Sequence, residues 1–125
     1  LVDGWIVELR RAGIQPVLAT SSPVTERLPT WTYIKQLIKR YILQRDYVDN
    51  DKRLRDVWAY NDFVRRYAAE NKIPLLDVER AVRISDQNRA LRPEFTSGDG
   101  LHLNEAAHQA LDRALQVTLT SLNRK

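Results

Sequence analysis

The stretch SGDGLHLNEAAH, residues 97–108, contains both histidines of the chain. Asp99 precedes His102 by three residues, and Gly98 and Gly100 flank the aspartate. Histidine is the side chain that changes charge near neutral pH without assistance, so it acts as a general base where it reaches a nucleophile. A carboxylate bonded to Nδ1–H fixes the imidazole tautomer and points Nε2 outward. Because glycine permits sharp bends, the spacing predicts an acid–base pair.

The same residues also have an ordinary structural interpretation. Aspartate and glycine are common in turns, and an acid close to a helix N-terminus interacts favourably with the helix dipole. A metal site is disfavoured, because His102 and His108 lie six residues apart, a spacing that on a helix would place them on different faces. Neither an HExxH motif nor a third histidine accompanies them. The residues of the stretch alone leave catalysis and a simple turn both open.

The elements around this loop alternate between helices and short apolar runs. Apolar stripes at helical spacing predict helices from Val2 to a cap at Gly13, over 31–45, over 54–70, and after an N-cap at Asn104. Two apolar runs, 16–20 and 73–78, predict buried parallel strands. We also expect a turn at 49–53 and a long surface loop, carrying a short helix, at 83–98. This order indicates an α/β fold with right-handed crossovers. Two strands make a poor sheet, so we expect further strands outside this chain.

Composition limits the alternatives. The chain has 125 residues, enough for one domain, and its 20 basic residues are interspersed with 16 acidic ones, so no single-sign block marks a nucleic-acid tail. No window approaches the roughly 18 apolar residues of a membrane span, and no signal sequence opens the chain, which predicts a soluble protein of undetermined compartment. The absence of cysteine excludes disulfides and thiolate metal sites, and the absence of methionine leads us to expect a piece of a longer product.

Two further features have a functional and a structural interpretation. Asp77 ends the second strand, where it can face a crevice or, more commonly, hydrogen-bond a neighbouring loop. Lys35, Lys39 and Arg40 lie on the polar side of the second helix, where charged residues are usually only solvated. An alternative hypothesis is a non-catalytic module that binds an anionic partner through this helix. That hypothesis requires one basic surface, continued by Arg53, Arg65 and Arg66.

Three segments together resemble a known family. GDGLHLN at 98–104, followed by a helix, resembles the final sequence block of the SGNH hydrolases, also called the GDSL esterase and lipase family. AGIQPVLATSSP at 12–23 is similar to the penultimate helix-to-strand passage of that family, and YNDFVRRYAAENKIPLLDV at 60–78 is similar to its YN helix and following strand. The resemblance implies a three-layer α/β/α, flavodoxin-like fold of parallel strands flanked by helices. Residues 1–125 would form its C-terminal part as a single domain.

The resemblance also implies a chemistry. His102 would be the general base and Asp99 its orienting acid in a serine esterase that hydrolyses carboxylic esters through an acyl-enzyme, without metal or organic cofactor. The serine of the GDS block and the glycine and asparagine of the oxyanion hole are absent, so we expect an N-terminal half as partner and little activity alone. Ser21 and Ser22 follow the first strand, but a Ser-Ser-Pro turn needs no catalytic explanation. Lipids, short-chain esters and acetylated sugars are all possible substrates. Ala107 stands where the family often has glycine.

Overall fold

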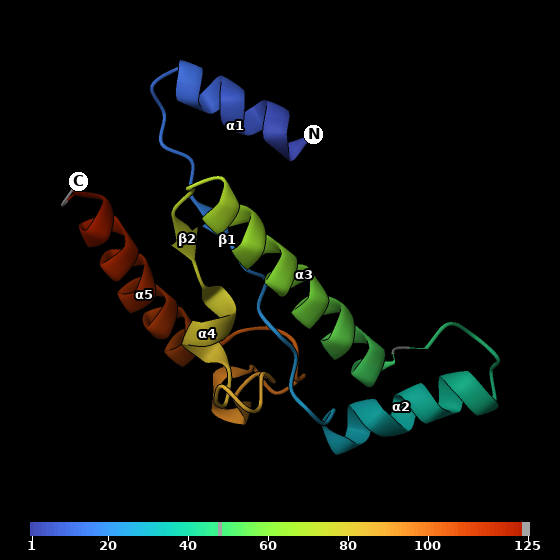
Figure 1. The fold of residues 1–125 in the computed structure, drawn as a ribbon. Helices are drawn as coiled ribbons and strands as arrows, with labels where there is room; N and C mark the ends of the chain where they lie inside the picture. Colours follow the sequence, from blue (N-terminus) through green and yellow to red (C-terminus); the bar gives the residue numbers. More distant parts are fainter. Residues whose placement is uncertain (48, 124–125) are drawn as a thin grey trace.

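The computed structural model describes residues 1–47 and 49–123, which form helices around a small parallel sheet. In chain order the elements are α1 (Val2–Arg11), β1 (Leu18–Ala19), α2 (Thr30–Tyr41), α3 (Asn50–Glu70), β2 (Leu75–Leu76), α4 (Val78–Val82), the 3₁₀ turn η1 (Pro93–Phe95) and α5 (Glu105–Asn123) (Figure 1). The predicted order of helices and strands is confirmed. The short helix α4 was not predicted.

The two strands pair in parallel, as predicted, but both are shorter than the apolar runs. Leu18 pairs with Leu75 and Ala19 with Leu76. The first run begins with Pro16, which has no N–H to donate, and the second run ends because Asp77 caps α4. The strands lie between α3 and α5 (Figure 1), with α3 packed on β1 and α5 on β2. The fold is therefore mixed α/β, and the complete three-layer sheet stays a prediction.

Three small clusters of buried apolar residues hold the elements together. One joins α1 to the end of α3 through Ile6, Ala68 and Ile73. The other two contain Val24, Leu54 and Ala90, and Val82, Leu91 and Ala107. Two of these residues, Ala90 and Leu91, lie in the segment predicted as a surface loop, so that prediction was wrong for its centre. The N–H of Leu91 donates to the carbonyl of Val24 at 2.9 Å, which draws this part of the loop inward.

The helix boundaries near α2 also differ from the prediction. α2 ends at Tyr41 and not near Arg45, and α3 begins at Asn50 where a turn was predicted. The reason for the early start is Asp49, whose side chain accepts a hydrogen bond from the N–H of Lys52 and so caps α3. Short polar residues at 49–51 favour a helix start as readily as a turn.

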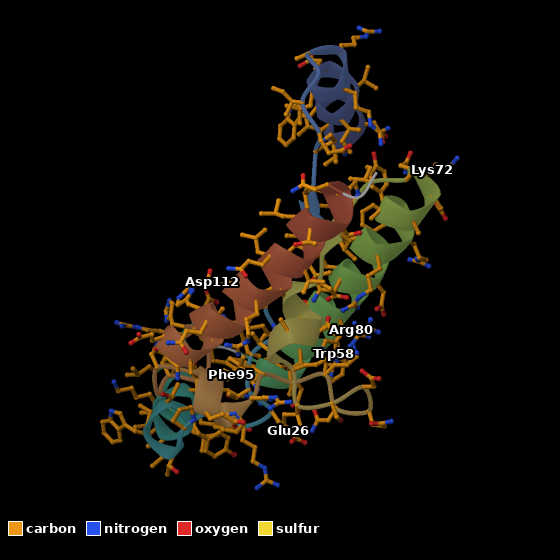
Figure 2. The ribbon with its side chains drawn as sticks, turned by 90° about the vertical axis from the view of Figure 1, so that its left-hand side faces the viewer. Glu26, Trp58, Lys72, Arg80, Phe95 and Asp112 are labelled. Atoms are coloured by element: carbon orange, nitrogen blue, oxygen red, sulfur yellow. The ribbon has the colours of Figure 1, made fainter. Side chains whose placement is uncertain are left out.

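The apolar stripes of α1 and α2 form helices as predicted but are only partly buried. α2 contributes no buried residue, and Ile34 and Leu37 of its stripe are 38% and 36% exposed. In α1, Ile6 is buried whereas Trp5 is 56% exposed. Figure 2 places α1 at one end of the molecule and the segment around Phe95 toward the other. None of the helices in the described ranges is both long and apolar enough to cross a membrane.

Candidate active site

The loop before α5 brings Asp99 and His102 into contact. Nδ1 of His102 lies within hydrogen-bonding distance of Oδ2 of Asp99. The other carboxylate oxygen, Oδ1, accepts the N–H of Leu101 at 2.9 Å and the N–H of His102 at 2.8 Å. The side chain of His102 is 74% exposed and that of Asp99 is 42% exposed. The carboxylate therefore organises the turn and occupies Nδ1, so any proton transfer to a ligand falls to Nε2.

Gly100 lets this loop pass close to the segment that follows β1. Its φ is +75°, and a Cβ on Gly100 would lie 2.5 Å from Oγ1 of Thr25. The N–H of Thr25 donates to the carbonyl of Gly100 at 3.0 Å, which joins the two segments. Gly98 also has a positive φ, +104°, but open space surrounds it. Gly100 is thus required both for its backbone conformation and for the close approach.

Asn104 joins the loop to α5 in the way the sequence predicts. Its Oδ1 accepts the N–H of Ala107 at 3.1 Å and so caps the helix. Its Nδ2 donates to the carbonyls of Glu94 and Thr96 at 2.7 and 3.1 Å. One side chain therefore sets the start of α5 and the closure of the loop that carries the acid and the base.

The surroundings of Asp99 keep it ionised. A hydrogen bond from the His102 side chain, with the backbone N–H groups of Leu101 and His102, holds the pKa of Asp99 well below its ordinary value of 3.8. The carboxylate therefore keeps its charge through the neutral and mildly acidic range. Such an acid can stabilise an imidazolium without itself taking the proton.

Ser21, after β1, and Ser97, in the acid–base loop, make structural contacts. The N–H of Ser21 donates to Oδ1 of Asn61 at 2.7 Å, and its carbonyl accepts from Nδ2 of the same asparagine at 2.8 Å. The N–H of Ser97 donates to the carbonyl of His102 at 2.9 Å. Within the part of the chain that the structure describes, no hydrogen bond joins a serine hydroxyl to the imidazole. The bonds of Ser21 and Ser97 are therefore structural ones.

A cavity of about 230 Å³ opens beside the acid–base loop. Asp99, Gly100 and Leu101 line one side, and Asn50 and Arg53 at the start of α3 line another. Because this cavity borders both the loop and α3, it can hold part of a ligand next to Asp99. Over the described residues, no group of three or more histidines, aspartates or glutamates is arranged to hold a metal ion.

A second acid, missed in the sequence, lies at the centre of a buried polar cluster. The Glu79 side chain in α4 is 0% exposed and accepts hydrogen bonds from Asn61 at 2.6 Å, Arg83 at 3.1 Å and Arg89 at 2.6 Å. Arg65 also pairs with it at 3.2 Å. Burial alone would raise the pKa of Glu79, but the bonds from Arg89 and Asn61 hold it below its ordinary value of 4.5. Arg83 lies four residues after Glu79, but Asn61, Arg65 and Arg89 come from other segments of the chain, so no local spacing indicated the whole cluster.

Asp77 has a structural role, which was the more common of the two interpretations of its position after the second strand. Its Oδ1 accepts the N–H of Arg80 at 3.1 Å, which caps α4, and the hydroxyl of Thr20 at 3.1 Å. Nε of Arg65 donates to its Oδ2 at 2.8 Å. Since Arg65 also pairs with Glu79, its charge is neutralised inside the fold. Arg65 is therefore not part of the continuous basic surface that the hypothesis of a non-catalytic binding module requires. Binding of an anionic partner stays a prediction.

Of the comparisons with known proteins, the comparison with solved structures finds chains with a similar fold. No family model matches the sequence, and no curated protein matches it. A GDSL-like lipase from Bacteroides thetaiotaomicron VPI-5482 is similar in structure, with a TM-score of 0.65 and 18% identity over 96% of this chain and 50% of that chain. A predicted acylhydrolase from Bacteroides fragilis NCTC 9343 has a TM-score of 0.65 and 21% identity over 97% of this chain and 49% of that chain. The chain thus shares its fold with about half of each of these two proteins.

Proposed function

We propose that this chain supplies the aspartate and the histidine of a serine-esterase triad, as the C-terminal half of an SGNH-type hydrolase domain with α/β/α layers. The observation that carries the proposal is the contact between Asp99 and Nδ1 of His102 on an exposed loop. The similarity to about half of a GDSL-like lipase supports it. The complementary half would bring the missing strands, the serine and the oxyanion hole.

The proposed mechanism uses His102 in both half-reactions. Nε2 of His102 accepts the proton of a serine hydroxyl on the complementary half while the serine oxygen attacks the ester carbonyl carbon. The tetrahedral intermediate expels the alcohol, which receives that proton from His102, and an acyl-enzyme remains. Water then attacks the acyl-enzyme while His102 takes a proton from the water. The second tetrahedral intermediate expels the serine oxygen, which receives that proton from His102, and the carboxylic acid leaves. Asp99 stays ionised and stabilises the imidazolium each time.

A direct test rejoins the chain to its complementary half, covalently or as a second polypeptide, and measures hydrolysis of p-nitrophenyl acetate. His102→Ala is expected to lower kcat by about 10⁴-fold or more, because the serine loses its base. His108→Ala is the matched control, since it removes the other histidine from α5. Equal activity in the two variants, or an equal loss in both, would contradict the proposal. The 125-residue chain alone is expected to be inactive.

A further inference from the structure

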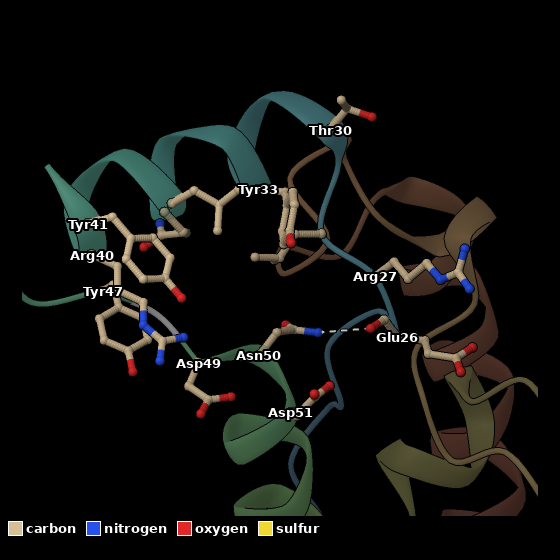
Figure 3. Close-up of a pocket in the computed structure, with 13 residues that line it drawn as sticks. Glu26, Arg27, Thr30, Tyr33, Arg40, Tyr41, Tyr47, Asp49, Asn50 and Asp51 are labelled. Carbon is tan, nitrogen blue, oxygen red and sulfur yellow. Dashed lines mark hydrogen bonds between the residues drawn. The ribbon is translucent and has the colours of Figure 1, made fainter.

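A second cavity, of about 660 Å³, lies between α2 and the start of α3 and plays no part in the proposed proton transfers. Three tyrosines line it: Tyr33 and Tyr41 of α2, and Tyr47 of the segment that follows. Their exposed fractions are 54%, 66% and 42%. A volume of this size fits a small ligand, and pockets for such ligands combine aromatic walls with a few placed polar groups. Figure 3 shows the three rings along the side of the cavity formed by α2 and the segment after it.

The opposite wall is polar and comes from Asp49, Asn50 and Asp51 (Figure 3). Nδ2 of Asn50 donates to the carbonyls of Thr25 and Glu26 at 2.8 and 3.1 Å, which holds its amide in place. Among the described residues, Oδ1 of Asn50 is buried and accepts no hydrogen bond. An unpaired buried acceptor is unfavourable, so a ligand whose donor reached this oxygen would gain a hydrogen bond that the protein itself does not supply.

Arg40 orders two of the rings. Its guanidinium carbon lies 5.1 Å from the ring centroid of Tyr41 and 4.7 Å from that of Tyr47. Contacts of this kind between a cation and aromatic faces are attractive. The two rings are therefore held at one end of the cavity, and a ligand there does not have to order both of them itself.

The charges of the cavity select among ligands. Glu26, Asp49 and Asp51 place three carboxylates around it, against the two guanidinium groups of Arg27 and Arg40. A phosphate-bearing alcohol is therefore disfavoured, and an acyl chain has no donors for these acceptors. A sugar ring fits both walls, because its hydroxyls donate to carboxylate and amide oxygens while its C–H faces pack on tyrosine rings.

The tyrosine cavity adjoins the candidate active site. Leu28, Gln36 and Asn50 line both this cavity and the smaller one, which Asp99 and Gly100 border on its other side. We propose that the tyrosine cavity binds the alcohol portion of the ester substrate and that this portion is a sugar. The inference rests on the proposed function, since it places the sugar beside the ester bond on which His102 would act.

The first test measures binding to the chain itself by ¹H–¹⁵N NMR. The probes are the methyl glycosides of glucose, galactose, xylose and N-acetylglucosamine, with sodium decanoate and glycerol 3-phosphate as competing chemistries. At least one glycoside is expected to give saturable shifts around Tyr33 and Asn50. Tyr33→Ala and Tyr47→Ala are each expected to weaken binding about fivefold, as for the loss of one aromatic contact. Trp5→Ala, which removes an exposed ring of α1, is the control and should bind as the parent chain does.

Binding of decanoate or glycerol 3-phosphate in place of every glycoside, or no shift with any glycoside, would overturn the inference. The second test uses the rejoined enzyme and compares kcat/KM for an acetylated methyl glycoside with kcat/KM for p-nitrophenyl acetate. Tyr33→Ala is expected to lower this ratio about fivefold. An unchanged ratio with hydrolysis that depends on His102 rejects the sugar pocket and leaves the esterase standing. If neither ester is hydrolysed in a way that depends on His102, the proposed esterase function is rejected. The NMR measurement then still decides whether the cavity binds a sugar.

Discussion

Asp99 and Glu79 are both acids with a lowered pKa, yet their surroundings are opposite. Glu79 is completely buried, and its charged partners are guanidinium groups of Arg65, Arg83 and Arg89. Asp99 is 42% exposed and faces an imidazole. A guanidinium keeps its proton at every physiological pH, whereas an imidazole can lose and regain one. The first arrangement can only hold structure, and the second can also do chemistry.

The two acids also differ in what their bonds connect. The Glu79 cluster joins α4 to α3 through Asn61 and to the segment at Arg89. The bonds of Asp99 stay within its own turn, to Thr96, Leu101 and His102. A lowered carboxylate pKa by itself therefore does not locate an active site in this protein. The identity and the exposure of the partner are what distinguish the two acids.

The largest expected effect is on the buried acid. Glu79→Gln removes the buried charge that Arg83 and Arg89 share, but these arginines keep partners at Asp86 and Asp62. The expected cost is therefore at the low end of the roughly 3–5 kcal/mol for breaking a buried ion pair. The free energy of unfolding should fall by that amount in urea titrations followed by circular dichroism. Asp99→Asn is the counterpart, because the amide oxygen can still accept the turn N–H groups and the site is exposed, so stability should change little. A similar loss in the two variants would remove the distinction between the clusters.

A smaller effect is expected where the acid–base loop approaches the segment after β1. Gly100→Ala introduces a Cβ 2.5 Å from Oγ1 of Thr25 at a φ of +75°, and strain of this kind costs about 1–3 kcal/mol. Gly4→Ala is the matched control, since Gly4 lies in α1 with open space around it. That change should be neutral or stabilise by up to about 1 kcal/mol. Urea unfolding measures both. A stable Gly100→Ala protein would show that the loop does not depend on this contact.

The smallest expected effect is a change in the pKa of the Asp99 carboxyl. The pKa of Asp99 is lowered, so its contribution to stability is present above the unfolded value near 3.8 and is lost as the pH falls below it toward the folded pKa. ¹³C NMR of its carboxyl carbon should show a fully ionised group at about pH 4, where an ordinary aspartate is roughly half protonated. In His102→Ala the midpoint should rise toward the ordinary value, because the largest cause of the shift is gone. An unchanged midpoint would mean that the imidazole contact does not stabilise the carboxylate.

Helix caps and the order of the elements could be predicted from the sequence, but the lengths of the strands and the burial of the loop at 83–98 could not. Asn104 caps α5 as its residue type predicts, and the helices occur in the predicted order. The strands were predicted too long, and the burial of Ala90 and Leu91 was missed, because both depend on which segments return to the same place. The loop around Ala90 looks polar in sequence. The burial of Ala90 and Leu91 and the hydrogen bond from Leu91 to Val24 show that it packs inside.

The contact between Asp99 and His102 follows from the sequence by itself. The two residues are three positions apart, glycines flank the aspartate, and the turn between them is closed by hydrogen bonds to the Asp99 carboxylate. The sequence also determined where most helices form, since apolar spacing and capping act over a few residues. Only the tertiary structure decided which acid is buried and which cavity adjoins the pair. Asn61, Arg65 and Arg89 reach Glu79 from α3 and from the loop after α4. The small cavity is bordered by the loop before α5 and by the start of α3, so packing between segments far apart in the sequence brings these groups together.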